Sequence, residues 1–117
     1  NNKKFKMSGG EQYRNFIYID DLIEAVLLII NNKNIDGEII NIGSSVSIKL
    51  KEVALKIGTL LNNSDKLEIG ALPYRETEIM HYHLEVDKAK ELVGFSASHS
   101  IDEGLNKTID FYVKTNS

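Results

Sequence analysis

The chain has 117 residues, of which 42% are hydrophobic and 26% charged, and its formal net charge is −3 at pH 7. This composition predicts one folded unit with a modest core, and the acidic balance argues against nucleic-acid binding, which normally requires a basic patch. The sequence has no cysteine, which excludes disulfides, zinc–thiolate sites and thiol catalysis.

The first third of the chain predicts two strands and a helix. Residues 5–8 read as a short strand, and residues 14–19 alternate in the manner of a second strand. Asp20 is expected to be the N-cap of a helix that ends near Asn31, with Asp21 in its first turn, so this carboxylate pair indicates capping rather than general acid–base catalysis. The apolar residues follow the helical period: Leu22, Ala25, Val26, Ile29 and Ile30.

The middle of the chain predicts a strand, a helix and a further strand. Residues 38–42 are almost continuously apolar, as in a parallel strand that is buried on both faces. Residues 66–69 read as a third main strand. Between them, residues 50–61 form an amphipathic helix whose buried stripe consists of Leu50, Val53, Ala54, Ile57, Leu60 and Leu61.

The last third predicts a loop and two helices. Pro73 requires an extended or turned segment, and residues 80–85 have the pattern of a short edge strand. Asp87 is expected to cap a short helix that ends at Gly94. Ser100-Ile101-Asp102-Glu103 has the pattern of a capping box for a final helix that buries Ile101, Leu105, Ile109 and Tyr112. The alternation of strands and helices predicts an α/β fold with a small partial sheet and about four helices.

Two arginines are the candidate ligand-binding residues. Arg14 stands at the start of a strand, where its planar guanidinium could grip a phosphate bidentately, or could simply pair with surface carboxylates. Arg75 lies in the loop that Pro73 begins, and loops carry a large share of functional residues. Glu78 could accept hydrogen bonds from a diol. Gln12 either orients Arg14 or faces water.

Other site chemistries are not supported by the sequence. His81, His83 and Glu85 would share one face of a strand, but no fourth ligand is visible and we predict no metal site. The chain contains neither a Gly-rich dinucleotide loop nor a Tyr-x-x-x-Lys pair, so we predict no catalytic and no cofactor-binding residue in it. The longest apolar run, residues 25–30, is too short to span a membrane, and without a signal peptide a cytoplasmic setting is expected.

The motifs, taken in order, resemble the C-terminal half of nucleotide-sugar epimerases and dehydratases, which are extended short-chain dehydrogenase/reductases. The first runs from Gly10 through Gln12 and Arg14 to Asp21, and the second from Gly37 to Ser44. The others are Leu72-Pro73-Tyr74-Arg75-x-x-Glu78, then Asp87, Lys90, Gly94 and Phe95, then residues 100–105 and 108–112. The chain differs in having Asn15 where Asp is usual, and no proline in Ser96-Ala97-Ser98.

This resemblance implies a division of labour. The family's N-terminal Rossmann half binds NAD or NADP and holds the catalytic Tyr and Lys, and the C-terminal part grips a nucleoside diphosphate sugar. It implies that Arg14 and Arg75 contact the diphosphate and that Glu78 holds a ribose hydroxyl. With Gln12, these are the candidate substrate-binding residues. Residues 1–117 would then be one partial, C-terminal substrate-binding domain that lacks the Rossmann half.

Two hypotheses follow. The first is a portion of an NAD(P)-dependent nucleotide-sugar epimerase, dehydratase or 4-ketoreductase, inactive by itself, of the type used in polysaccharide biosynthesis. The second is a stand-alone, non-enzymatic binding or interaction module on the same scaffold. Because the chain starts with Asn1 rather than Met, we expect a fragment. Packing surfaces that the Rossmann half would cover should be exposed, so we also expect a homo-oligomer.

Overall fold

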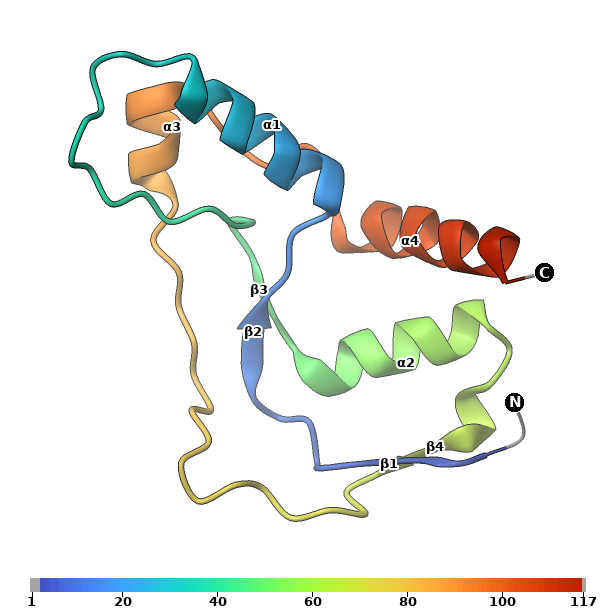
Figure 1. Ribbon diagram of the computed structural model, residues 1–117. Helices are drawn as coiled ribbons and strands as arrows, with labels where there is room; N and C mark the ends of the chain where they lie inside the picture. The colour runs from blue at the N-terminus through green and yellow to red at the C-terminus, as the bar shows by residue number, and fades with distance from the viewer. Residues whose placement is uncertain (1–2, 117) are drawn as a thin grey trace.

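The structure is a computed structural model that describes residues 3–116. Its elements follow in chain order as a mixture of short strands and longer helices (Figure 1). They are β1 (Phe5–Met7), β2 (Tyr13–Asn15), α1 (Ile19–Ile30), β3 (Ser47–Lys49), α2 (Leu50–Leu60), η1 (Ser64–Lys66), β4 (Leu67–Ile69), α3 (Asp87–Val93) and α4 (Ile101–Thr115). The predicted class, a small partial α/β fold with four α-helices, is confirmed for the described residues.

The strands pair in two separate two-stranded sheets. β1 and β4 are parallel, with Phe5 opposite Leu67 and Met7 opposite Ile69. β2 and β3 are antiparallel, with Arg14 opposite Ile48. The sequence analysis did not predict β3, and β2 is shorter than the strand expected over residues 14–19.

The best-buried apolar cluster lies where α1 meets α3 (Figure 1). Ala25 of α1, Ala89 of α3 and Phe95 are each at most 2% exposed. Ile40 and Ile42 pack against this cluster from the segment that follows α1. The small alanines allow the two helices to approach closely, which fixes α3 beside α1.

Two predicted strands are wrong within the described chain. Residues 38–42 and 80–85 are extended but belong to no strand. A strand needs a neighbour for its backbone groups, and residues 38–42 have no ladder partner among residues 3–116. Residues 80–85 lie in a long segment between β4 and α3 that runs along one side of the molecule (Figure 1).

The helix boundaries confirm some predicted caps and correct others. Ser100 and Glu103 form the reciprocal capping box, and Gly94 ends α3 in the left-handed conformation with φ 71°. The helix predicted to start at Asp20 instead has Tyr18 at its N-cap, and α3 has Val86 there rather than Asp87. Neither of these two caps makes a side-chain hydrogen bond.

Several residues predicted to be buried are exposed. On α1 these are Leu22, Val26 and Ile30; on α2 Leu60 and, directly after it, Leu61; and on α4 Tyr112. The predicted buried stripes are therefore wrong at these positions, where no described residue covers the apolar side chains.

The molecule is a flat slab rather than a sphere. Its principal dimensions are 51 × 39 × 18 Å and its radius of gyration is 16.9 Å, against about 13 Å for a compact domain of this length. The accessible surface is 8470 Å², about 2,000 Å² more than a compact monomer of this mass exposes. The shape therefore leaves a large area available for contact.

Candidate functional site

The structure brings three of the four predicted site residues together. Glu78 accepts hydrogen bonds on both carboxylate oxygens, from Gln12 Nε2 at 2.8 Å and from Arg14 Nη2 at 2.9 Å. These partners are 66 and 64 residues away in sequence. β2 supplies Arg14, and the loop that follows Pro73 supplies Glu78. The cluster of Gln12, Arg14 and Glu78 thus ties that loop to β2.

The guanidinium of Arg14 is only partly occupied. Its Nη1 donates to the carbonyl oxygens of Tyr13 and Ile79, both at 2.7 Å. Three of the five N–H donors that an arginine carries are therefore used, which leaves two without a partner among the described residues. The side chain of Arg14 is 29% exposed, so a ligand can reach it.

Arg75 is not part of this cluster. It is exposed, and its side chain makes no hydrogen bond or ion pair with any described residue. Its carbonyl accepts the Glu78 N–H at 3.1 Å, which forms a turn between the two residues. The turn keeps the backbone of Arg75 close to Glu78, while the Arg75 side chain is exposed to solvent.

Gln12 leaves one polar atom unsatisfied. The residue is 3% exposed, and its Oε1 has no hydrogen-bond partner among the described residues. The Nε2 contact to Glu78 fixes which end of the amide is which, because a carboxylate can only accept. A buried acceptor without a donor is unfavourable, so Gln12 Oε1 is a polar atom that the described chain leaves unsatisfied.

Asn15, which replaces the usual aspartate of the motif, has a clear structural role. Its Nδ2 donates to the Ser44 carbonyl at 2.7 Å, and its Oδ1 accepts the Ser44 N–H at 2.9 Å. A carboxylate could make only the second of these bonds. A Cβ atom at Gly43 would lie 2.6 Å from Asn15 Oδ1, so the glycine is needed to let the amide in.

Glu11, the residue before Gln12 in the chain, forms ion pairs with two lysines. Glu11 pairs with Lys49 at 2.8 Å and with Lys51. Hydrogen bonds from Lys49 and then Lys51 lower the pKa of Glu11 to about 2, and the same bond to Glu11 raises the pKa of Lys49. Gly10, with φ 66°, lets the chain pass against the Lys51 backbone, where a Cβ would be too close.

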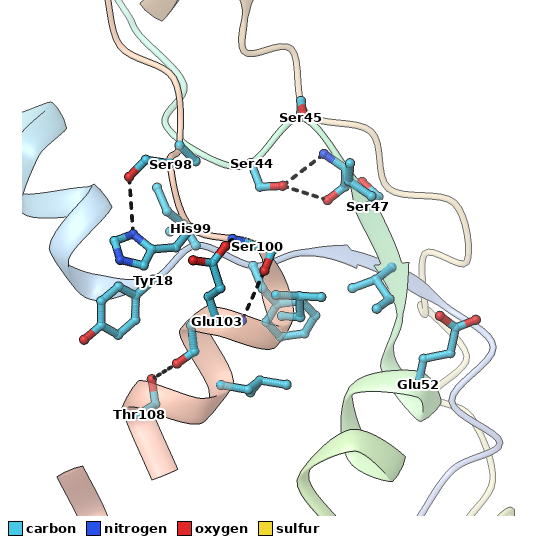
Figure 2. A pocket seen from close by; sticks show the side chains of 18 of the residues that line it. Tyr18, Ser44, Ser45, Ser47, Glu52, Ser98, His99, Ser100, Glu103 and Thr108 are labelled. Atoms are coloured by element: carbon cyan, nitrogen blue, oxygen red, sulfur yellow. Dashed lines mark hydrogen bonds between the residues drawn. The ribbon is translucent and has the colours of Figure 1, made fainter. Parts of the chain in front are cut away.

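A cavity of about 630 Å³ lies beside this cluster rather than in it. Figure 2 shows serines 44, 45 and 47 on one side of it and Ser98, His99 and Ser100 on the other. None of the four predicted site residues lines it. Sequence reasoning did not identify this cavity, because its walls come from β2, β3 and the start of α4, which local patterns cannot bring together.

The pairing of Asp21 with His99, which lines this cavity, was also missed. Asp21 is 1% exposed and accepts hydrogen bonds from His99 Nδ1, the His99 N–H and Ser98 Oγ. Burial alone would raise the pKa of Asp21, but the hydrogen bonds from His99 and Ser98 outweigh it and the net direction is down. One signal was present: Asp21 precedes the buried Ala25 by four residues, so both lie on the inward side of α1.

A smaller cavity of about 360 Å³ lies along Tyr13 and residues 81–84. His81 stacks on Tyr13 with ring centroids 5.7 Å apart. Among residues 3–116 no group of three His, Asp or Glu side chains is arranged to hold a metal ion. None of the described helices is both long and apolar enough to cross a bilayer.

The sequence profile of the family described as GDP-mannose 4,6 dehydratase matches residues 1–108. The chain belongs to this family. It is 36% identical over 110 residues to a CDP-abequose synthase of Salmonella muenchen, covering 93% of this chain and 37% of that protein. It is 35% identical over 107 residues to a UDP-N-acetyl-alpha-D-glucosaminuronate decarboxylase of Bacillus cytotoxicus, covering 88% of this chain and 33% of that protein.

The fold has solved counterparts in the same group of enzymes. One is a UDP-glucuronic acid 4-epimerase of Bacillus cereus in complex with UDP-glucuronic acid and NAD, with a TM-score of 0.83 and 28% identity. It aligns with 98% of this chain, which spans 36% of that structure. Membership of the epimerase/dehydratase family, expected from the motifs, is therefore confirmed, and the chain spans about a third of the length of the relatives it matches.

Proposed function

We propose that this chain is the C-terminal, nucleoside-diphosphate-sugar-binding portion of an NAD(P)-dependent epimerase, dehydratase or 4-ketoreductase. The observation that carries the proposal is the Gln12–Arg14–Glu78 cluster, because it assembles three residues of the expected substrate grip from two distant motifs. The three relatives named above all act on or bind nucleotide sugars. NAD or NADP would be bound by the remainder of the parent protein.

In this proposal each residue has a separate task. Arg14 uses its two remaining donors on the diphosphate, while Glu78 holds it in one orientation and so lowers the ordering cost of binding. Arg75, exposed and unpaired within the described chain, supplies the second positive charge. Glu78 keeps lone pairs for a ribose hydroxyl, since a carboxylate has about four acceptor positions. Such a grip orients a substrate and performs no bond chemistry.

The proposal also includes contact with further polypeptide. α1 exposes an apolar face made of Ile19, Leu22, Ile23, Val26, Leu27 and Ile30. The unpaired extended residues 38–42 follow it in the chain, and Ile39 is 83% exposed. In the parent protein the Rossmann half would cover this face, and in the isolated chain a second copy would do so, giving a homo-oligomer.

Titration of the chain with UDP-glucose, dTDP-glucose, CDP-glucose and GDP-mannose by calorimetry tests the substrate grip. We expect one of the four to bind, and Arg75→Ala and Arg14→Lys each to weaken it about tenfold or more. Lys88→Ala is the matched control, since Lys88 is a surface cation paired with Glu38 at 2.6 Å. Equal losses in all three variants, or no binding of any of the four, would contradict the proposal.

The sequence encoded upstream of Asn1 distinguishes the enzyme from the alternative, a non-enzymatic module. A glycine-rich βα turn and a Tyr-x-x-x-Lys pair there would favour the enzyme. We expect the isolated chain to show no turnover with NAD and the nucleotide sugar that it binds. Measurable turnover by the 117 residues would overturn the division of labour.

A further inference from the structure

The buried carboxylate of Asp21 holds the segment that leads into α4. Ser98 Oγ donates to it at 2.9 Å, the His99 N–H at 3.0 Å, and His99 Nδ1 lies 2.8 Å from it. The side chain of His99 is 18% exposed and that of Asp21 is 2% exposed. The imidazole therefore lies at the edge of the cavity with one nitrogen facing inward and the other outward.

The outward nitrogen contacts a lysine of α4. Lys107 Nζ lies 3.1 Å from His99 Nε2. An ammonium group can only donate, so Nε2 must be the acceptor and cannot carry a proton in this arrangement. The ring proton is then on Nδ1, where it is donated to Asp21. The contacts thus define a neutral imidazole of one tautomer.

Addition of a proton to Nε2 would place two donors, both positively charged, against each other. The pair would repel at this distance, whereas the contact between the new imidazolium and Asp21 would strengthen. Two other groups face the ring. The Tyr18 ring lies tilted against it with centroids 4.8 Å apart, and the Glu103 carboxylate, which accepts the Ser100 N–H in the capping box, attracts both His99 and Lys107.

We propose that Asp21, His99 and Lys107 form a proton-controlled latch between α1 and α4. With neutral imidazole, Lys107 is held at Nε2 and over the Tyr18 ring, 5.8 Å from its centroid. With imidazolium, Lys107 is released while His99 stays on Asp21. Imidazole is the side chain that ordinarily changes charge between about pH 5 and 8.

The latch acts on the wall of the cavity of about 630 Å³. His99, Gly104 and Thr108 all line that cavity, and Figure 2 shows His99 beside Tyr18 next to the first turns of α4. Lys107 precedes Thr108 on α4, so its attachment to His99 fixes how this part of the helix borders the cavity. Release of Lys107 loosens that border without breaking the Asp21 contacts.

Ring-nitrogen NMR of the 117-residue chain tests the latch directly. At pH 8 we expect His99 to be neutral with its proton on Nδ1, and cross-peaks between the Lys107 side chain and the Tyr18 ring. At pH 5 we expect imidazolium signals and loss of the cross-peaks. Two results would overturn the proposal: a proton on Nε2 at pH 8, or cross-peaks that persist after His99 is protonated.

One variant and one matched control separate His99 from the other histidines. His99→Asn keeps an N–H that can donate to Asp21 but has no group that gains a proton, so the pH dependence of the Tyr18 and Lys107 signals should disappear. His83→Asn removes an exposed histidine elsewhere and should leave that dependence unchanged. If the dependence survives in His99→Asn or is lost in His83→Asn, the latch does not exist.

Discussion

The polar groups at the start of α4 and the apolar face of α1 differ in whether the chain itself provides their contacts. At α4 the chain provides its own partners: the capping box is complete and the buried Asp21 receives three hydrogen bonds. The opposite side of α1, by contrast, presents Leu27 and Ile30 at 54% and 70% exposure. Helix α1 therefore has a complete side, on which Asp21 is hydrogen-bonded to the segment before α4, and an incomplete side, on which Leu27 and Ile30 remain exposed.

This difference indicates which contacts belong to the chain alone. Buried polar groups are generally paired within the molecule, because an unpaired one costs more than the bond contributes; Gln12 Oε1 is the exception among the buried side-chain atoms of the described residues. Apolar surface can remain exposed until another surface covers it. The surplus of about 2,000 Å² over a compact monomer is comparable to the area that a stable interface buries. The exposed side of α1 is thus the place to look for that interface.

Breaking the complete side should have the largest effect on folding. Asp21→Asn removes the charge and replaces one carboxylate oxygen with an NH2 group. A donor from His99 or Ser98 then faces another donor, so we expect a loss of about 2–3 kcal/mol in the free energy of unfolding. Urea denaturation measures it. Asp20→Asn, at the exposed neighbouring position, should change stability by less than about 0.5 kcal/mol. Similar losses in the two variants would contradict the assigned role.

Breaking the incomplete side should change association instead of folding. Leu27→Lys places a charge in the middle of the exposed face and should weaken self-association at least tenfold, or about 1.4 kcal/mol. Sedimentation velocity over a concentration series measures this. Leu55→Lys on α2 is the control, because Leu55 is also exposed, at 42%. A chain that is monomeric at all concentrations would refute the expected homo-oligomer.

The capping box allows a smaller test of the complete side. Ser100→Ala removes the hydroxyl that accepts the Glu103 N–H at 3.1 Å and should cost about 1 kcal/mol. The helix signal in circular dichroism and the urea midpoint should both fall. Ser96→Ala, in the exposed loop before α4, should leave both unchanged.

A pH experiment sharpens the comparison at the Glu11–Lys49–Lys51 contact. Because the folded-state pKa of Glu11 is lowered to about 2 from 4.5, its stabilisation is fully present above pH 4.5 and is lost as the pH falls toward 2. Glu11→Gln should therefore reduce the decline in the urea midpoint over that range. Glu24→Gln, at an exposed position of α1, should not. This is the smallest expected effect, because the contact is at the surface.

The sequence predicted elements whose signals are local. The capping box at Ser100, the glycine that ends α3 and the helical periods of α1 and α2 each depend on residues within one or two turns. The parallel pairing of β1 with β4 was not predictable, because it joins residues about 60 positions apart. The strand expected at residues 38–42 failed for a related reason: apolar content indicates burial but does not supply a neighbour.

The candidate site divides in the same way. The motifs identified Gln12, Arg14 and Glu78, and the structure shows that Gln12 and Arg14 both donate to Glu78. The inward position of Asp21 was hidden by its charge, since an aspartate at a helix start is ordinarily a cap. Its partner His99 lies 78 residues away, and no spacing rule connects the two. Arg75 remains a prediction from its motif.

A slab 18 Å thick has few places where a backbone amide is far from water. Hydrogen–deuterium exchange in such a body reports mainly on local opening, because little tertiary cover has to be removed first. The slowest-exchanging amides should therefore be those of α1 and α3 around Ala25 and Ala89. A second surface placed against α1 would extend slow exchange along that helix, and the change would map the contact residue by residue.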